Sequence, residues 1–315
     1  MQQKKRNPIA RLWSSLTHPR RSMVKLMERT SSHWSDKHYQ QILYRLNIGH
    51  WPNLEEPESY TEKMQWIKLY CRRPEFTGMV DKLAVKQYVT DRIGAKYVIP
   101  LIGAWDSVDD IDWESLPEQF VLKCTHDSGS VCVCRDKNTF DREAAKAKLR
   151  AGLAADYFLH RREWPYKNVP RKVIAEQYVD GLGRLDSIEY KVSCFGGKVK
   201  FVTICTGIAH DKPELRHNDH FLVEDGQWKQ MDWKMIYTPS GKQYERPAIT
   251  DEMIRLCETL AAGTPYLRVD WYCLDGQLYF GEMTFFTWSG LEKFEPAEWD
   301  KTLGSWIDLP KEKIC

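Results

Sequence analysis

The sequence lacks long apolar runs, Cys-x-x-Cys pairs and a large excess of one charge. No apolar run among its 315 residues approaches the ~20 residues of a transmembrane helix, and no apolar signal segment opens the chain, so the sequence predicts a cytoplasmic protein. The formal net charge of +2 gives no support to nucleic-acid binding. None of the 9 cysteines forms a Cys-x-x-Cys pair, so we expect reduced, mostly buried thiols rather than a zinc site.

What the chain does contain is the composition of a folded protein. Hydrophobic residues make up 42% and charged residues 29% of it, and its length allows two or three packed lobes. Segregated strand and helix patterns predict an α+β architecture. We divide the chain into a basic amphipathic tail (1–35), a helical region (36–95), a first lobe (96–185) and a second lobe (186–315).

The first segment is basic. Its Lys and Arg residues precede the first acidic residue, Glu28, and apolar residues are interleaved with them at helix-like spacing. This combination can lie on an anionic membrane surface, which predicts a peripheral membrane contact through residues 1–26. The alternative is a frayed, solvated basic tail. The basic residues are Lys4, Lys5, Arg6, Arg11, Arg20, Arg21 and Lys25, and the apolar ones are Ile9, Leu12, Trp13 and Leu16.

Periodicity and turn residues predict the regular elements. Helices are expected within 36–93, at 141–158, and from a cap at Thr250 to Gly263. Strands are expected at 97–102, 120–124, 173–179, 190–195, 199–205, 266–273 and 278–283. The polar and aromatic stretch 210–243 is expected to be a long loop with a small hairpin.

One expected strand carries a lysine near its end, and a loop of small polar residues follows it. The lysine is Lys123, and the loop contains Ser128, Gly129 and Ser130. Such a lysine can neutralise phosphate oxygens, while backbone N–H groups and hydroxyls of the loop close over the phosphates. This is not a P-loop, because no Gly-Lys-Ser/Thr sequence opens a helix. Taken alone, the segment is equally typical of a hairpin with an exposed lysine.

A second segment, the strand at 173–179, can present alternating backbone donors and acceptors to an adenine edge. An acidic residue beyond it, Glu189 or Asp186, can hold ribose hydroxyls. By itself this pattern is weak evidence for a nucleotide site, because any strand that ends in an exposed loop offers the same backbone groups.

The strongest signal is a pair of carboxylates on two late strands. Asp270 follows Arg268 on one strand, and Glu282 lies two residues before Thr284 on the next. Burying carboxylates on a sheet is costly unless a cation compensates, and Mg²⁺ suits this role because it takes hard oxygen ligands and keeps phosphate in its shell. Arg268 adds a positive charge suited to an anionic intermediate. The alternative is a surface pairing of these charges without a metal.

The register of these two strands tests the metal site. With a two-residue loop at Asp275 and Gly276, Asp270 and Glu282 would lie on opposite faces of the sheet. A three-residue loop over 274–276 would instead place Arg268 opposite Glu282, with Asp270 diagonal to both. We therefore predict an odd-length or bulged loop.

The order of these pieces resembles the ATP-grasp pattern. The segment from Arg268 to Gly290 is similar to the Arg-x-Asp and Glu-x-Asn segment of D-alanine–D-alanine ligases, except that Thr284 stands where Asn is usual. A narrower resemblance, to the TupA-like ATP-grasp family, covers nearly all of 38–308. It is carried by the strings at 62–70, 80–82, 126–130, 162–168 and 292–296.

The resemblance implies an ATP-grasp fold, in which two α+β lobes clamp ATP, with a helical N-terminal region and with ATP and two Mg²⁺ ions as cofactors. Lys82 and Lys191 are supporting candidates, although each alone is more typical of a surface lysine. The implied nucleotide-binding residues are Lys82, Lys123, Ser128, Gly129, Ser130, Glu176, Gln177, Tyr178, Val179, Glu189 and Lys191. The implied metal ligands are Asp270, Glu282 and Thr284; Arg268 and Lys123 would be catalytic; His126, Trp288, Ser289 and Gly290 would contact the substrate.

The activity that the resemblance implies is amide ligation in surface-polysaccharide biosynthesis. ATP would activate a carboxylate as an acyl phosphate, and an amine or amino acid would attack it, with the carboxylate expected on a uronic-acid-containing glycan. Two alternatives stay open: a phosphotransferase that acts on a glycan, and a non-catalytic nucleotide-binding scaffold of polysaccharide assembly. The loop residues His210, Arg216, His217 and His220 are further substrate candidates, although such histidines are more typical of a solvated loop.

Overall fold

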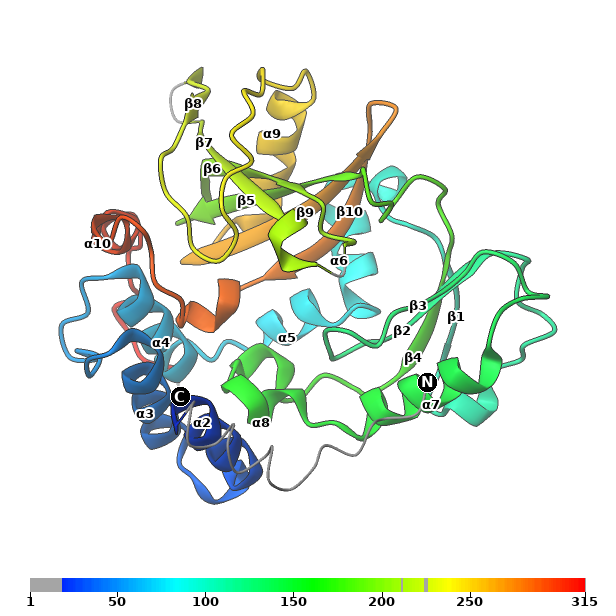
Figure 1. Cartoon of the computed structure of the whole chain (residues 1–315), viewed down its shortest axis with the longest axis horizontal. Helices are drawn as coiled ribbons and strands as arrows, with labels where there is room; N and C mark the ends of the chain where they lie inside the picture. The colour runs from blue at the N-terminus through cyan, green and yellow to red at the C-terminus, as the bar shows by residue number, and fades with distance from the viewer. Residues whose placement is uncertain (1–18, 211, 224–225, 315) are drawn as a thin grey trace.

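The computed structural model describes residues 19–210, 212–223 and 226–314, which fold into two antiparallel sheets surrounded by helices (Figure 1). The α+β class predicted from the sequence is confirmed. The apolar residues of the predicted membrane contact, Ile9 to Leu16, lie outside the described residues. Within the described ranges, no helix is both long and apolar enough to cross a bilayer.

The helices expected within 36–93 are present. They are α3 (Asp36–Ile48), α4 (Tyr60–Tyr70), α5 (Glu75–Val80) and α6 (Ala84–Ile93). Helix α2 (Pro19–Arg29) precedes them and lies in the segment that was predicted as a basic tail. Helix α4 begins with a capping box, in which the side chains of Ser59 and Glu62 accept hydrogen bonds from each other's backbone N–H groups. Gly94 follows α6, and its N–H donates to the carbonyl of Thr90. Helices α5 and α6 lie between the two sheets (Figure 1).

The first sheet has the strand order β1-β4-β2-β3, with all pairs antiparallel. Its strands are β1 (Leu101–Trp105), β2 (Phe120–Cys124), β3 (Cys132–Cys134) and β4 (Val173–Gln177). Phe120, Leu122 and Cys124 alternate along β2 and are buried in one apolar cluster with Leu149 of helix α7 (Arg142–Ala154). The sheet is therefore covered on one face by α7.

Two predicted elements near this sheet are wrong in their limits. The strand predicted at 97–102 begins only at Leu101, because Ala95–Tyr97 forms a 3₁₀ turn that packs Tyr97 against Trp271. The single helix predicted at 141–158 is two helices, since Ala155 leaves the helical conformation after α7. Asp156 then caps α8 (Tyr157–Arg161) by accepting a hydrogen bond from the N–H of Leu159.

The second sheet has the strand order β10-β9-β5-β6-β7-β8. Its strands are β5 (Ile188–Phe195), β6 (Lys198–Thr206), β7 (His217–Leu222), β8 (Lys229–Gln230), β9 (Tyr266–Leu274) and β10 (Gln277–Thr284). Helix α9 (Thr250–Ala261) buries Met253, Leu256 and Leu260 in the same core as β5, β6 and β9. The last helix, α10 (Glu298–Ser305), packs against α4.

The described part of the stretch 210–243 is mostly irregular and contains the small β7–β8 hairpin, as predicted. The prediction missed that β7 also pairs with β6 along its whole length and so widens the sheet. The polar sequence of β7 gives no sign of this pairing, although Asp219 and His220 are buried there. One prediction for this lobe is corrected. Thr250 is not the helix cap: it is the first helical residue, its hydroxyl donates to the carbonyl of Pro247, and Ile249 occupies the cap position.

Candidate active site

The β9–β10 hairpin carries the two predicted metal-binding carboxylates on one face of the sheet. The loop has two residues, Asp275 and Gly276, both with positive φ, so the prediction of a longer or bulged loop is wrong. The register instead shifts within β10, between Phe280 and Glu282, where Gly281 is the extra residue. As a result Glu282 lies directly opposite Asp270.

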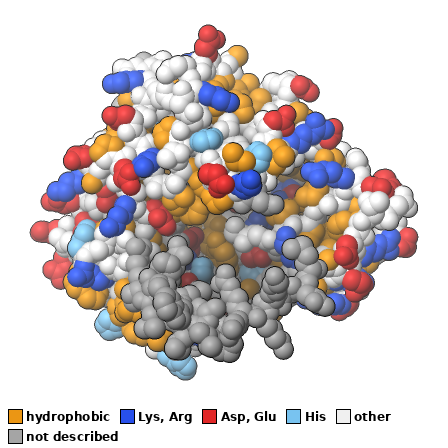
Figure 2. All heavy atoms as spheres, in the orientation of Figure 1, with side chains coloured by type: hydrophobic (Ala, Val, Ile, Leu, Met, Phe, Trp, Pro, Cys, Tyr) orange, Lys and Arg blue, Asp and Glu red, His pale blue; other side chains and the backbone are white. Residues whose placement is uncertain are grey.

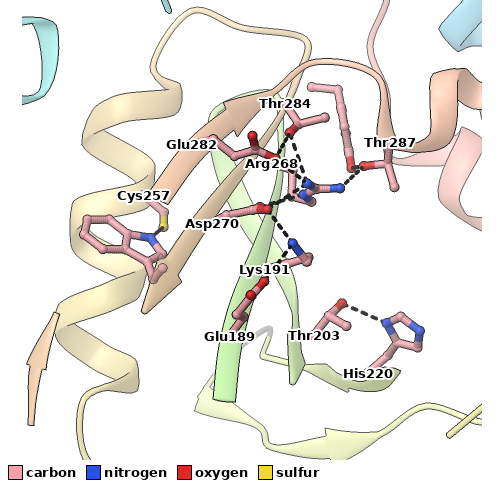
Figure 3. Close-up of polar contacts among 12 residues, drawn as sticks. Glu189, Lys191, Thr203, His220, Cys257, Arg268, Asp270, Glu282, Thr284 and Thr287 are labelled. Atoms are coloured by element: carbon pink, nitrogen blue, oxygen red, sulfur yellow. Dashed lines mark hydrogen bonds and ion pairs between the residues drawn. The ribbon is translucent and has the colours of Figure 1, made fainter. Parts of the chain in front are cut away.

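Four side chains converge at this point, as predicted (Figure 3). Arg268 donates from Nε and Nη2 to the two carboxylate oxygens of Asp270, at 2.6 and 2.7 Å. The same Nη2 lies 3.1 Å from the hydroxyl of Thr284 and 3.4 Å from Oε1 of Glu282. Because β10 lies beside β9 and its bulge turns Glu282 and Thr284 to this face, one guanidinium reaches both strands.

A fifth side chain, the fourth charged one, comes from β5, the strand on the other side of β9. Lys191 pairs with Asp270 in the sheet register, and its Nζ lies 2.7 Å from Oδ2 of Asp270 and 3.4 Å from Oε2 of Glu189. Burial alone would raise the pKa of Asp270, but Arg268 and Lys191 together hold it below its ordinary value. Burial lowers the pKa of Lys191, but Asp270 and Glu189 contribute to a net rise above its ordinary value. Asp270 therefore stays ionised and Lys191 stays charged near neutral pH.

The donor set around Asp270 suits a magnesium ion that is completed by phosphate and water. Three hydrogen bonds from Arg268 and Lys191 occupy Asp270, and a carboxylate offers about four lone-pair sites, so one stays available. The side chain of Glu282 is 48% exposed, so it also remains accessible to a ligand. In the described part of the chain there is no group of three His, Cys, Asp or Glu side chains placed to hold a metal. Mg²⁺ commonly binds through one or two carboxylates plus substrate phosphates, so this set fits it.

A cavity of about 220 Å³ lies between the two sheets beside this cluster. Charged side chains from both sheets and from helix α6 line it, and its walls are otherwise apolar. The charged lining residues are Lys82, Lys86, Lys123, Glu176, Glu189, Lys191, Asp270 and Glu282. The predicted nucleotide-binding lysines are thus brought together with the predicted metal ligands.

Glu176 is the centre of the charges on the first sheet. Its two carboxylate oxygens each lie 2.6 Å from a lysine, Lys86 from α6 and Lys123 from β2. Burial alone would raise the pKa of Glu176, but the two lysines together lower it below its ordinary value. Lys86 was not predicted, although it lies four residues after Lys82, a spacing that would give a shared face on one helix. In the structure Lys82 lies just before α6, which begins at Ala84.

The loop after β2 is held near the cavity by its own hydrogen bonds. Ser130 is buried, and its hydroxyl donates to Asp127 at 2.7 Å and accepts from the N–H of Cys124 at 2.8 Å. Lys82 donates to the backbone carbonyl of Asp127. Ser128 and Gly129 at the tip are exposed, and a β-carbon on Gly129 would meet nothing within 4 Å. The tip therefore has room for a ligand beside it.

A larger cavity of about 400 Å³ opens on the other side of the charged cluster, and Lys191, Glu282 and Tyr166 line both cavities. Figure 2 shows the molecule hollowed between the second sheet and the first, with hydrophobic and charged side chains along the hollow. Arg268 and Thr284 line the larger cavity. The two cavities therefore meet at the cluster.

The family of the chain follows from its sequence. A family described as TupA-like ATPgrasp matches residues 62–308, which include both sheets. The chain belongs to the TupA-like ATP-grasp family. No curated protein sequence matches this TupA-like protein.

Solved structures similar to this TupA-like protein include two ligases. D-alanine–D-alanine ligase from Bacillus anthracis complexed with ATP is 17% identical, with a TM-score of 0.38, over 71% of this chain and 57% of that chain. L-amino acid ligase from Bacillus licheniformis is 12% identical, with a TM-score of 0.43, over 81% of this chain and 56% of that chain. The TupA-like chain thus spans little more than half the length of these enzymes. At such low identities and TM-scores, these similarities establish no activity for it.

Only some of the remaining predicted site residues of the TupA-like protein line one of the two cavities. Gln177 and Tyr178 line a separate surface hollow with Pro100, and Val179 lines neither of the two cavities. His126 is buried, lies 3.2 Å from the carbonyl of Ala155 through Nε2, and lines neither cavity.

The turn at 287–290 contributes to the larger cavity. Trp288 and Ser289 line it, both with positive φ, whereas Gly290 does not line it. Gly290 instead packs against α4, where a β-carbon would come within 2.4 Å of Met64. Of the four candidates at 210–220, His220 alone lines this cavity.

Three charged residues near the larger cavity were missed by the sequence interpretation. Arg161 and Glu163 line the cavity, and Lys68 of α4 is fully buried behind Ser289. Glu163 lies in one of the strings that carry the family resemblance, but nothing in its spacing predicts that it faces a cavity.

Proposed function

We propose that this chain is an ATP- and Mg²⁺-dependent ligase that joins a carboxylate to an amine through an acyl phosphate. The observation that carries the proposal is the charged cluster of Arg268, Asp270, Glu282 and Lys191 at the border of two cavities. One cavity is lined by several lysines and suits a triphosphate, and the other is larger and suits the substrates. A phosphoryl group that passes from one to the other must cross this cluster.

In this proposal the smaller cavity holds the nucleotide. Lys82 and Lys123 bind phosphate oxygens, with Lys86 as a third cation, and the loop at 128–130 closes over them through its backbone N–H groups. Glu189 holds the ribose hydroxyls. The adenine lies against the end of β4 at 176–179. Glu176 pairs with strands on both sides, and the N–H of Gln177 donates to Pro100, so the backbone of Tyr178 and Val179 is left to offer donors and acceptors.

Asp270, Glu282 and Thr284 are the residues that would hold Mg²⁺. When bound, the ion acts as a Lewis acid that offsets charge on the transferring phosphoryl oxygens. Arg268 supports the same step from the protein side, because its guanidinium reaches both strands and faces the larger cavity. Lys191 keeps Asp270 ionised and adds a second positive charge. In this proposal the side chains position the substrates and neutralise the charge of the phosphoryl group, and none needs to form a covalent bond.

The substrates are proposed from the family resemblance. A uronic-acid-containing surface glycan or its precursor would supply the carboxylate, and an amine or amino acid would supply the nucleophile. The larger cavity suits such ligands, since it combines charged groups with the aromatic side chains of Tyr157, Tyr166 and Trp288.

The test is to incubate the purified full chain with ATP, Mg²⁺, a panel of uronic acids and oligouronides, and a panel of amines and amino acids. The expected result is phosphate release that depends on both substrates and a product with the mass of a new amide. Hydroxylamine in place of the amine should trap the acyl phosphate as a hydroxamate. A phosphorylated sugar would instead establish a phosphotransferase, and no ATP consumption with any pair would contradict the ligase.

A further inference from the structure

The larger cavity contains two charged side chains that the proposed reaction does not use. Glu163 is only 7% exposed and lines this cavity, and Arg161, two residues earlier, lines it as well. One oxygen of Glu163 accepts a hydrogen bond from the hydroxyl of Ser289. Over the described ranges, nothing donates to its other oxygen, and the side chain of Arg161 makes no hydrogen bond or ion pair. A buried carboxylate with one unpaired oxygen costs free energy unless a ligand donates a hydrogen bond or a positive charge to it.

The nearest buried cation, Lys68, donates no hydrogen bond to Glu163 and acts on it only through space. Lys68 donates to the backbone carbonyl of Ser289 at 2.5 Å and to Gln65 at 3.2 Å. Among the described residues, no nitrogen–oxygen pair within 4.0 Å joins Lys68 to Glu163. Burial lowers the pKa of Lys68 to about 7, so this lysine is itself poorly compensated. It holds the turn at 287–290 and leaves Glu163 facing the cavity.

The chain between the two groups explains how both reach the same cavity. Arg162 has a left-handed backbone, with φ of 56°, and it is buried on the opposite side against Asp36 of α3, at 3.2 Å. The turn at Arg162 therefore allows Arg161 and Glu163 to face the cavity together. Arg161 acts on the carboxyl of Glu163 through space, because Lys68, more strongly, and Arg161 both oppose the rise that burial causes in the pKa of Glu163. The two side chains are thus near each other without an ion pair.

We propose that Arg161 and Glu163 form a subsite for the head group of an α-amino acid, with the guanidinium binding its carboxylate and Glu163 binding its ammonium group. The inference rests on the proposed function in taking this amino acid as the amine substrate. A zwitterion neutralises both free groups at once, whereas a simple amine or a simple carboxylate neutralises one and leaves the other uncompensated. Tyr157 and Tyr166, whose rings are 4.8 Å apart, line the same cavity and offer aromatic faces to an ammonium group.

The subsite is tested by calorimetric titration of the full chain with free α-amino acids of both hands, and separately with ethylamine and lactate. The wild type should bind at least one amino acid, and alanine should bind at least tenfold more tightly than ethylamine or lactate. Arg161→Gln and Glu163→Gln should each weaken the tightest amino acid at least tenfold, with ATP binding unchanged. Lys167→Gln, an exposed change on the same segment, should bind like the wild type.

Thermal unfolding of each variant checks that the fold is retained. The proposal is overturned if no amino acid binds the wild type, or if both folded variants bind it with wild-type affinity. The hydroxamate assay separates this outcome from failure of the ligase, because hydroxylamine bypasses the amine subsite. Hydroxamate formation without amino-acid binding would reject the subsite alone. Amino-acid binding without hydroxamate from any uronic acid would reject the ligase and leave the subsite standing.

Discussion

Gly281 lies against the backbone of Asp270, so closely that a β-carbon at Gly281 would come within 3.0 Å of the carbonyl oxygen of Asp270. Gly281 is also the extra residue of the bulge in β10. The bulge turns Glu282 and Thr284 to the face that carries Arg268 and Asp270. A glycine at this one position is therefore what allows the two strands to present their charged groups together.

Gly281→Ala should disturb this arrangement more than it disturbs the fold. The new methyl group meets backbone, which cannot move aside as a flexible side chain can, so the bulge must shift. We expect a loss of stability of about 1–3 kcal/mol and a fall in ATP turnover of roughly tenfold or more. Urea unfolding and a phosphate-release assay measure the two effects.

Gly78→Ala is the matched control. A β-carbon at Gly78 would meet nothing within 4 Å, and the residue lies within helix α5, where alanine is favoured over glycine by about 0.5–1 kcal/mol. This variant should be at least as stable as the wild type and equally active. Full activity in Gly281→Ala would show that the bulge does not set the geometry of the site.

The sequence predicted which residues meet at the hairpin but not how they meet. For Asp270 and Glu282 to share one face of the sheet, the register of the two strands had to contain an irregularity, and the structure contains one. The prediction placed it in the loop, because loop length is the usual determinant of register. In the structure the irregularity lies at Gly281, where the backbones of β9 and β10 approach closely. This approach depends on the pairing of the two strands, so the sequence of β10 alone does not predict it.

Glu176 should be a stabilising residue as well as a candidate ligand-binding one. Its side chain is 7% exposed and compensates both Lys86 and Lys123. Glu176→Ala leaves two partly buried lysines without their partner, so the free energy of unfolding should fall by about 3 kcal/mol. Denaturant unfolding measures this change.

Glu114→Ala provides the comparison for Glu176. Glu114 also pairs with a cation, Arg142, but its side chain is 81% exposed. Its removal should change the free energy of unfolding by no more than about 0.5 kcal/mol. Equal effects of the two substitutions would mean that the buried charges around Glu176 do not depend on it.

His220 should remain neutral throughout the physiological range. Burial lowers its pKa to about 3, and its ring stacks on Trp233 at 3.9 Å. The unfolded chain takes up this proton below about pH 6.5, whereas the native state does so only near pH 3, so stability falls as the pH decreases between these values. From pH 7 to 5, this loss should be about 2 kcal/mol.

His220→Asn should remove that part of the pH dependence, whatever its effect on stability at pH 7. Urea unfolding at pH 7 and pH 5 compares the two proteins. Nitrogen NMR of the histidine ring gives an independent reading, and protonation of His220 near pH 6 in the native state would contradict the account.

The residues missed by the sequence interpretation share one property: their place in the site depends on tertiary contacts. Lys86 could have been predicted, since it lies four residues after Lys82 and both lysines line the same cavity. Glu163 could not, because its free oxygen and its place in the cavity result from contacts with Ser289, more than a hundred residues away. The pairing of β7 with β6 was missed for a related reason, since the buried Asp219 and His220 of β7 are polar. Local patterns predict elements, but only packing determines which polar groups are left unpaired.

The most direct test of the account is ATP turnover by Asp270→Asn. Asparagine keeps the size of the side chain but removes the charge that Arg268 and Lys191 hold in place. The account predicts a folded protein, by circular dichroism and thermal unfolding, in which substrate-dependent phosphate release falls at least a hundredfold. Wild-type phosphate release from folded Asp270→Asn would contradict the assignment of this cluster as the catalytic centre.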